Sequence, residues 1–395
     1  MIKYNNGMFF KGKDYYKNGI LKKLSNLPII LNKRKPVIIY GAARLGRIFL
    51  SQLKTHQIKV AGFIDKNTRL QKNKIDGIPV YSLKQARNKF LLNPIIVGSV
   101  LYENEIRKVL IKAKFKNIYT PYLLNIVMPK IFSVSEYRQV FKLFTSKKYQ
   151  YQINKVYRLL SDKKSKDVYS NLINFRLTGD YKYLEKAKSK NRIFAEKDIL
   201  PLSKKEIYVD CGAYNGDTVK SFIDVVNGNY KNIYAFEPDK LNFTKMKKWV
   251  NDNKIKLIHC YKKGVYSSIG KIQFQNKGTA DSRISRLGRL TKLTTLTKDV
   301  RIALSYISMV NLDSFFEGRQ KPTLIKMDIE GAEMEAIKGM KLLLKKYRPK
   351  LVISLYHQPR DYWEIILLLR SINKDYNFFV RHYTNEFADT ICYAI

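Results

Sequence analysis

The sequence is short of cysteine, and no long apolar run occurs in it. Its 3 cysteines, Cys211, Cys260 and Cys392, stand far apart, so a disulfide framework or a zinc site is excluded and a reducing compartment is indicated. No apolar run reaches the about 18 residues that a membrane-spanning helix requires. The first residues lack an apolar signal core followed by small residues, so we expect a cytoplasmic protein.

Acidic residues are also scarce. The chain has 32 Asp and Glu against 75 Lys and Arg, which gives a formal charge of +43. A charge of this size suggests nucleic acid or an anionic surface. However, the excess is spread along the whole chain and is larger in its first half, away from the motifs described below. We therefore expect generic lysine-rich surfaces, peripheral contact with an anionic membrane surface, and no specific nucleic acid partner.

The length of 395 residues predicts two domains with connecting structure. In the first part, the apolar run that begins at Pro36 ends in Gly41, and a segment of helical character follows it. Two further apolar runs, 58–65 and 94–99, read as strands. This pattern predicts a small doubly wound α/β domain within residues 1–122.

Residues 123–200 have a different pattern. Apolar residues recur at three- and four-residue spacing in 135–144, 151–160 and 167–177, as they do in packed amphipathic helices. We therefore predict a helical connector between two α/β domains.

From residue 201 to residue 395, strands and helices alternate. Apolar runs end at Cys211, Phe236, Tyr261, Met327 and Tyr356, with helical segments between them, including one predicted over 333–346. This alternation predicts a mostly parallel sheet. Residues 377–381 and 390–394 flank a short polar turn, a spacing that favours an antiparallel hairpin at the end of the chain.

Two motifs in this part predict a cofactor site. Asp210-Cys-Gly-Ala-Tyr-Asn-Gly-Asp217 follows a strand, and its glycines allow backbone to approach a ligand closely. Glu237-Pro-Asp239 follows the next strand, at the spacing where a carboxylate accepts hydrogen bonds from ribose hydroxyls. We infer a pocket for an adenosine moiety. Its candidate residues are Asp210, Gly212, Ala213, Asn215, Gly216, Asp217, Glu237 and Pro238.

A third motif, Lys326 to Glu333, indicates an acceptor site at the carboxyl edge of the sheet. We predict Lys326, Asp328, Glu330 and His357 as catalytic residues, with His357 as the base because a histidine pKa near 6.5 suits proton acceptance. In the alternative interpretation, the glutamates only favour a helix start and Lys326 pairs with a carboxylate. Two carboxylates without a dense cluster are a poor metal signature, so we expect no metal.

Residues 150–395 resemble the FkbM family of methyltransferases. The resemblance rests on the motifs at 209–218, 235–239, 311–314 and 325–333 and on the strand from Pro349 to His357. It implies a class I methyltransferase fold, S-adenosylmethionine as cofactor, Asp217 as a contact of the methionine amino group, and a role for 281–285 in shaping the acceptor or adenine side. Ser354 stands where family members often have an acid.

Residues 1–122 are similar to the nucleotide-binding module found in front of some FkbM-type proteins, with 63–65 and 78–80 as the matching segments. Together, the resemblances imply an O-methyltransferase that acts on a sugar hydroxyl of a surface glycan or of its nucleotide-linked precursor. Two alternatives stay open: an RNA methyltransferase, and a binding protein for nucleotides or nucleotide sugars that does not catalyse a reaction.

Overall fold

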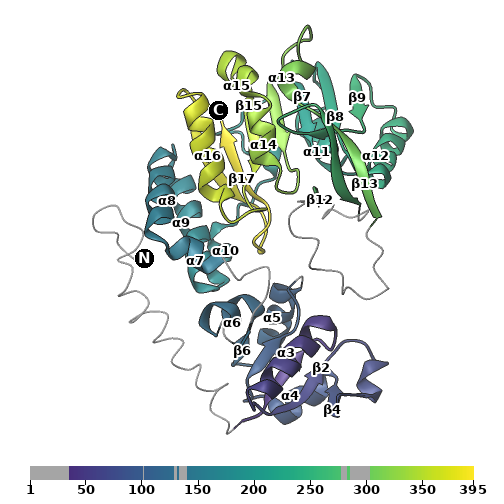
Figure 1. Cartoon of the computed structure of the whole chain (residues 1–395), viewed down its shortest axis with the longest axis vertical. Helices are drawn as coiled ribbons and strands as arrows, with labels where there is room; N and C mark the ends of the chain where they lie inside the picture. Colours follow the sequence, from purple (N-terminus) through teal and green to yellow (C-terminus); the bar gives the residue numbers. More distant parts are fainter. Residues whose placement is uncertain (1–34, 101, 129–130, 133–139, 277–282, 285–302) are drawn as a thin grey trace. The chain divides into compact units, whose positions relative to one another are not determined.

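The computed structural model describes residues 35–100, 102–128, 131–132, 140–276, 283–284 and 303–395 (Figure 1). The chain divides into two compact units, which we call the N-terminal unit (1–154 and 170–186) and the C-terminal unit (155–169 and 187–395). Helices of the predicted connector are therefore divided between the two units, and the domain boundaries inferred from the sequence stay a prediction. No helix in the described part of the chain is long and apolar enough to span a membrane.

The N-terminal unit is built on a six-stranded sheet. Its strand order is β3-β4-β2-β1-β5-β6, with β1, β2, β4, β5 and β6 parallel and only β3 antiparallel to its neighbour. The strands are β1 Val37–Tyr40, β2 Val60–Ile64, β3 Lys74–Ile75, β4 Ile78–Tyr81, β5 Ile95–Val97 and β6 Ile118–Tyr119. The connecting helices are α3 Arg44–Thr55, α4 Leu83–Phe90 and α5 Glu103–Lys112, with the 3-10 turn η2 Leu70–Lys72. The prediction of a separate α/β domain is confirmed, with a mostly parallel sheet.

The turn after β1 is fixed by glycine packing and by a carboxylate. Gly41 has a φ of +105°, and a Cβ on Gly46 would lie 1.9 Å from the carbonyl oxygen of Gly41. Asp65, directly after β2, accepts the backbone N–H of Ala42 at 2.8 Å and that of Asn67 at 2.8 Å. Only glycines allow backbone segments to come this close.

Short helices follow. They are α6 Pro121–Val127, α7 Val140–Thr145, α8 Lys147–Leu159, α9 Lys163–Thr178 and α10 Lys182–Ala187. The predicted helices at 151–160 and 167–177 correspond to α8 and α9, whereas part of the predicted helix at 135–144 lies outside the described residues. The helical character of this region was thus predicted correctly, although α10 was missed.

The C-terminal unit contains a seven-stranded sheet with the order β9-β8-β7-β14-β15-β17-β16. Its strands are β7 Ile207–Cys211, β8 Asn232–Phe236, β9 Ile258–Tyr261, β14 Leu324–Met327, β15 Lys350–Ser354, β16 Phe378–His382 and β17 Thr390–Ala394. Strands β7, β8, β9, β14 and β15 are parallel to one another, while β17 is antiparallel to β15 and to β16. The predicted class I sheet with a closing hairpin is confirmed.

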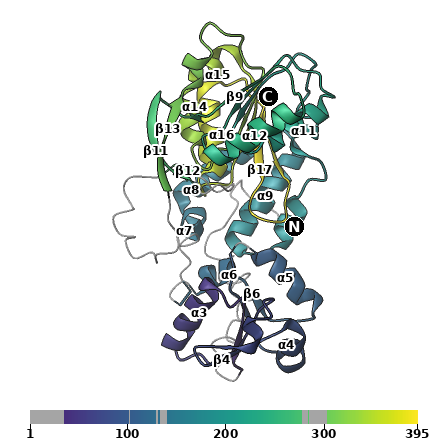
Figure 2. The ribbon, with the colours of Figure 1, turned by 90° about the vertical axis from the view of Figure 1, so that its right-hand side faces the viewer.

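Helices cover both faces of this sheet. Helices α11 Asp217–Val225 and α12 Lys240–Asp252 lie on one face, and α14 Glu333–Lys338, α15 Lys341–Tyr347 and α16 Asp361–Ile372 lie on the other (Figure 2). Between them, strands such as β14 are buried along their whole length, as parallel strands covered on both faces are.

The single helix predicted over 333–346 is wrong, because the chain breaks between α14 and α15. Gly339 lies so close to a neighbouring loop that a Cβ there would stand 2.2 Å from the carbonyl oxygen of Tyr266. The short helix α13, Leu312–Phe315, then supplies Asp313, whose carboxylate accepts the N–H groups of Leu342 and Leu343 at 3.0 and 2.8 Å. These bonds fix the start of α15 at a point where the sequence pattern predicts a continuous helix.

A second sheet was not predicted. Its strands are β10 Gly264–Val265, β11 Gly270–Asn276, β12 Arg283–Ile284 and β13 Ala303–Val310, in the order β10-β13-β11-β12. β11 and β13 form a long antiparallel pair from the Gly270–Met309 pair to the Asn276–Ala303 pair. The segment 281–285, expected to shape the ligand site, falls within this region, and except for Arg283 and Ile284 it lies outside the described residues.

The free edge of β16 is covered by residues that precede the sheet in sequence. The N–H groups of Phe378 and Val380 donate to the hydroxyls of Ser161 and Ser165 at 3.1 and 2.9 Å. Arg381 is buried and forms an ion pair with Asp162 at 2.6 Å. The 3-10 turn η3, Ile193–Ala195, packs against α11, where Phe194 contacts Phe222. The covering segment around Ser161 and Ser165 leaves β16 no open hydrogen-bonding edge at Phe378 and Val380.

Candidate functional site

The glycine turn after β7 is held between two neighbouring strands. Gly212 has a φ of +84°, and a Cβ there would lie 1.9 Å from the carbonyl oxygen of Asp328. Its N–H donates to the carbonyl oxygen of Phe236 at 2.9 Å. An L side chain is excluded by the backbone conformation and by the contact, so only glycine fits this position.

Glu237 stands at the end of β8 and binds the turn through both carboxylate oxygens. Oε2 accepts the N–H of Tyr214 at 2.9 Å, and Oε1 accepts the N–H of Asp239 at 2.8 Å. Burial raises the pKa of Glu237 to about 7, in spite of these two hydrogen bonds. Each carboxylate oxygen has a second lone pair. A fixed carboxylate of this kind is suited to accept hydrogen bonds from the two hydroxyls of a ribose.

A buried ion pair supports the turn from below. Lys326 Nζ lies 3.0 Å from Asp210 Oδ1, and it donates to the carbonyl oxygen of Gly212 at 2.9 Å. The hydroxyl of Thr218 donates to the other oxygen of Asp210 at 2.6 Å. Burial alone would lower the pKa of Lys326, but the charges of Asp210 and Asp328 outweigh it and raise the pKa to about 12. Lys326 is thus a charged residue that fixes the turn, which agrees with the alternative interpretation of this side chain.

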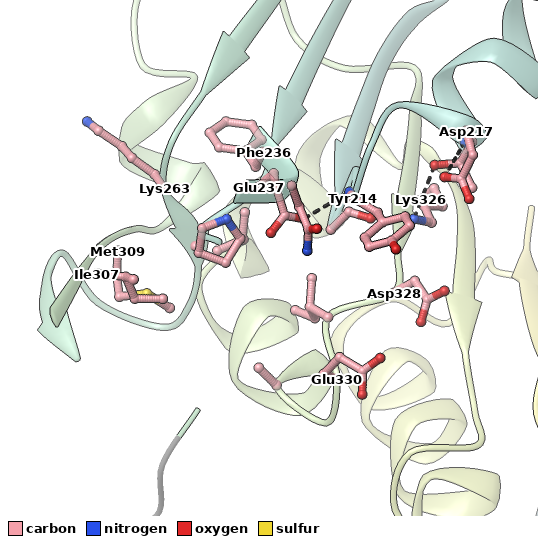
Figure 3. A pocket seen from close by; sticks show the side chains of 18 of the residues that line it. Tyr214, Asp217, Phe236, Glu237, Lys263, Ile307, Met309, Lys326, Asp328 and Glu330 are labelled. Carbon is pink, nitrogen blue, oxygen red and sulfur yellow. Dashed lines mark hydrogen bonds between the residues drawn. The ribbon is translucent and has the colours of Figure 1, made fainter. Parts of the chain in front are cut away.

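These elements surround a cavity of about 250 Å³ in the C-terminal unit. Figure 3 shows Glu237 and Tyr214 across the cavity from Asp328 and Glu330, with Ile307 of the second sheet at a further side. The predicted site residues that line the cavity are Gly212, Asp217, Glu237, Pro238, Lys326, Asp328 and Glu330. The predicted residues that do not line it are Asp210, Ala213, Asn215, Gly216 and His357.

The acceptor side of the cavity is acidic. Asp328 follows β14 and accepts a hydrogen bond from the hydroxyl of Tyr356 at 3.0 Å. Burial alone would raise the pKa of Asp328, but His357 and the charge of Lys326 outweigh it, so the pKa lies well below its usual range. Glu330, two residues further, has a φ of +57°, which turns the chain into the short helix α14. Both residues line the cavity.

His357 lies behind this acidic side, between carboxylates. Its Nδ1 is 2.9 Å from Glu333 Oε1, and its Nε2 is 3.2 Å from Asp328 Oδ1 and 3.7 Å from Glu330 Oε1. Burial alone would lower the pKa of His357, but Glu333 and the two other carboxylates outweigh it and raise the pKa well above the usual value. The ring nitrogens thus face carboxylates and His357 does not line the cavity, so these surroundings do not favour its predicted role as base.

Asp389 and Tyr356 line the same cavity and were missed from the sequence. Asp389 lies in the turn between β16 and β17, and burial, followed by the charge of Asp328, raises its pKa to about 6. Tyr356 directly precedes His357. The position of Tyr356 after β15 was a usable signal, whereas nothing in the sequence shows that the closing hairpin carries Asp389 back to the site.

Comparison with known proteins agrees with this geometry. Residues 210–380 match the family model of the FkbM methyltransferase domain, and residues 33–118 match the model named C2185-like, N-terminal. None of the curated proteins compared with the chain matches it.

Among solved structures, an FkbM methyltransferase from Methylobacillus flagellatus KT is similar over 98% of this chain and 99% of its own, with a TM-score of 0.69 and 19% identity. This likeness shows a shared fold. An rRNA methylase from Streptococcus thermophilus covers 52% of this chain and 96% of its own, with a TM-score of 0.31 and 14% identity. Fibrillarin from Aeropyrum pernix, solved with natively bound S-adenosyl-L-methionine, covers 50% of this chain and 71% of its own, with a TM-score of 0.31 and 10% identity.

The family match spans all three motifs of the site, from Asp210 through Glu237 to Glu333, and the class I strand order places them around one cavity. Residues 210–380 therefore form a methyltransferase domain of the FkbM family, and this chain is a methyltransferase that uses S-adenosylmethionine.

Proposed function

We propose that this methyltransferase transfers the methyl group to a sugar hydroxyl of a surface glycan or of its nucleotide-linked precursor, in the cytoplasm. The observation that carries this proposal is the acidic side of the cavity, where Asp328 and Glu330 stand across from Glu237 (Figure 3) and Asp389 also lines the cavity. Carboxylates accept hydrogen bonds, so they suit an acceptor that carries several hydroxyls. Peripheral contact with an anionic membrane surface belongs to the same proposal.

The residues of the site would bind and align both substrates. Glu237 would hold the ribose hydroxyls of the cofactor, while Asp328 and Glu330 would orient hydroxyls of the acceptor toward the methyl group. When bound, S-adenosylmethionine supplies the methyl group: the acceptor oxygen bonds to the methyl carbon as the carbon–sulfur bond breaks, which leaves S-adenosylhomocysteine.

The hydroxyl proton must leave as the new bond forms. Asp389 is suited to accept it, because this carboxylate lines the cavity and its pKa is raised to about 6 by burial and by the charge of Asp328. A carboxylate with a pKa near the working pH is a better base than Asp328, whose pKa is lowered. We therefore propose Asp389 as the proton acceptor in place of His357.

Methyl-labelled S-adenosylmethionine tests this function. The protein would be incubated with nucleotide sugars, oligosaccharides and a structured RNA, and each product would be separated and counted. We expect label in a sugar product and a matched release of S-adenosylhomocysteine, both about 100-fold slower in Asp389→Asn. Label in RNA alone, or cofactor binding without transfer to any hydroxylated acceptor, would contradict the proposal.

The RNA alternative draws its support from the charge of +43. At the site itself the charge has the opposite sign, since Asp328, Glu330 and Asp389 all line the cavity and would repel a phosphate backbone. A protein that only binds its ligands would transfer no methyl group in this assay. It would also keep its affinity for S-adenosylmethionine after amide substitution of these three carboxylates.

For the N-terminal unit we propose a ribose-containing nucleotide as ligand. The support is Asp65, which is held by the N–H groups of Ala42 and Asn67 as Glu237 is held by those of Tyr214 and Asp239. Titration of a nucleotide sugar into the wild type and into Asp65→Asn tests it. We expect binding to the wild type that is at least tenfold weaker in the variant. Equal binding to both proteins would reject Asp65 as the ribose contact.

A further inference from the structure

The carboxylates around His357 are placed like ligands of a metal ion. Three atoms converge at the acidic side of the cavity: His357 Nε2, Asp328 Oδ1 at 3.2 Å from it, and Glu330 Oε1 at 3.7 Å from it. Ligands that are about 2.1 Å from a cation lie about 3 Å apart when they occupy neighbouring octahedral positions. The distance to Asp328 already fits this spacing. That to Glu330 is longer, and 27% of this side chain is exposed, which leaves it room to move closer.

The nitrogen at the centre of this group is buried and lacks a hydrogen bond. The side chain of His357 is 6% exposed, and its Nε2 has no hydrogen-bond partner among the described residues although Asp328 is close. The oxygen of Asp328 therefore does not stand where an N–H bond would point. A lone pair on Nε2 directed between two carboxylates is a donor set for a divalent cation.

Glu333 orients the ring from the other side. Its Oε1 contacts His357 Nδ1 at 2.9 Å and accepts the N–H of Ile329 at 2.9 Å, and its side chain is 1% exposed. Glu333 does not line the cavity, whereas Asp328 and Glu330 do. A carboxylate that fixes Nδ1–H and leaves Nε2 as the ligand is the usual support of a metal-binding histidine. Potential ligand atoms of Asp328, Glu333 and His357 all lie within 4.8 Å of one another.

We propose that His357, Asp328 and Glu330 bind a divalent cation, with Glu333 as the positioning residue of His357. One nitrogen and two carboxylate oxygens suit Mn²⁺, and water or acceptor hydroxyls would complete its coordination. This proposal reverses our expectation of no metal, which considered only Asp328 and Glu330, the two carboxylates that are close in sequence. It rests on the proposed function only for the role of the cation, which is to bind an acceptor hydroxyl and lower its pKa before the proton leaves.

Direct binding of Mn²⁺ tests the site without any assay of methyl transfer. The protein is treated with EDTA, freed of chelator and titrated with MnCl₂, while free Mn²⁺ is followed by electron paramagnetic resonance. We expect one bound ion per chain, with affinity at least 100-fold weaker in His357→Ala and Asp328→Asn and about tenfold weaker in Glu330→Gln and in Glu333→Gln. Glu364→Gln, on the nearby helix α16 and outside the site, serves as the matched control and should bind as the wild type does.

Two results would overturn the proposal. One is a wild type that binds no Mn²⁺, which means that a protonated imidazole occupies the group instead. The other is equal binding by every variant, which means that the ion sits elsewhere on the surface. Circular dichroism shows which variants fold, and the isosteric Asp328→Asn and Glu330→Gln keep the test valid if His357→Ala does not. Retained binding of S-adenosylmethionine with transfer to a sugar in EDTA would reject the proposed role of the cation in the reaction and leave the proposed function intact.

Discussion

In both units, a carboxylate holds the backbone of the first turn in the same way. The units differ in the residue that the neighbouring parallel strand places beside this turn. In both, a carboxylate after the second strand accepts the N–H of the first turn, Asp65 from Ala42 and Glu237 from Tyr214, and the two residues are 23 positions apart in each case. The next parallel strand also pairs alike. The N–H of Gly98 donates to Tyr40 at 2.7 Å, and that of Asp328 to Cys211 at 3.0 Å.

At the matched position of this next strand, the N-terminal unit has Gly98 and the C-terminal unit has Asp328. Gly98 allows close backbone packing, since a Cβ there would lie 2.9 Å from Gly46 Cα. Asp328 instead places a carboxylate at the edge of the cavity. Both turns hold a carboxylate against backbone N–H groups, and in the second turn Asp328 adds a further carboxylate beside it. Binding and chemistry are thus separable, and changes at the two turns should affect them independently.

The largest expected effect comes from removing the negative charge of Asp328, which has no counterpart at Gly98 in the first turn. Asp328→Asn removes the charge that faces the acceptor while the turn and Glu237 stay in place. We expect kcat to fall by about 1,000-fold, with the Kd for S-adenosylmethionine changed less than threefold. Turnover with labelled cofactor and isothermal titration measure the two quantities. Equal losses in both would mean that Asp328 holds the cofactor and does not act on the acceptor.

Alanine at the glycines tests whether the turns are independent. Gly212→Ala forces a Cβ against the backbone of Asp328, so we expect binding of S-adenosylmethionine to weaken by roughly 100-fold. The matched change, Gly46→Ala, meets the backbone of Gly41 at the same 1.9 Å and should leave that affinity unaltered. Titration, with circular dichroism as a check of folding, distinguishes the two. Loss of cofactor binding in Gly46→Ala would show that the units are coupled.

A smaller effect is expected from the carboxylates themselves. Glu237→Gln keeps the shape but weakens acceptance of the ribose hydroxyls, so the Kd for S-adenosylmethionine should rise about 20-fold. Asp65→Asn is its counterpart in the N-terminal unit and should leave this Kd unchanged. A similar rise of the Kd in both variants would contradict the assignment of the cofactor to the turn beside Glu237 alone.

The smallest effect is a dependence of cofactor affinity on pH. The pKa of Glu237 is raised to about 7 by burial, and ribose hydroxyls bind its ionised form more strongly. Affinity should therefore be full above pH 8 and fall as the pH drops through 7, to roughly a tenth of its plateau at pH 6. Titrations from pH 6 to 8.5 would measure this, and Glu237→Gln should flatten the curve. A flat curve for the wild type would mean that another group provides the ribose contact.

The sequence predicted best those features that depend on local pattern. The strand ends at Cys211 and Met327 and the strand 390–394 were predicted correctly, because each strand is a run of mostly apolar residues bounded by polar turn residues. The position of Glu237 at the cavity also followed from its spacing to the glycine turn. The break at Gly339 did not, since it depends on the loop at Tyr266, which packs against it from a distant part of the chain.

The sequence did not reveal the contacts of the site where several segments meet. Asp210 and Lys326 were predicted as ligand-binding and catalytic residues, but they form a buried pair across adjacent strands. The alternative interpretation gave Lys326 a carboxylate partner, but the motifs did not identify Asp210 as that partner. Asp389 reaches the cavity only because the closing hairpin returns to it. The surroundings of His357 require Glu333 from α14 and Asp328 from β14 together, so neither its protonation nor its suitability as a metal ligand could be inferred from the histidine alone.

The residues that cover the edge of β16 determine where a stable fragment of this chain can begin. A fragment that starts at residue 201, the boundary suggested by the motifs, loses Ser161, Ser165 and Asp162, and so leaves the N–H groups of Phe378 and Val380 and the guanidinium of Arg381 without these partners. Such an edge pairs readily with another strand, and the fragment would aggregate during expression. A fragment that starts at residue 155 retains the whole covering segment. The methyltransferase domain is thus longer, as a folding unit, than its sequence signature.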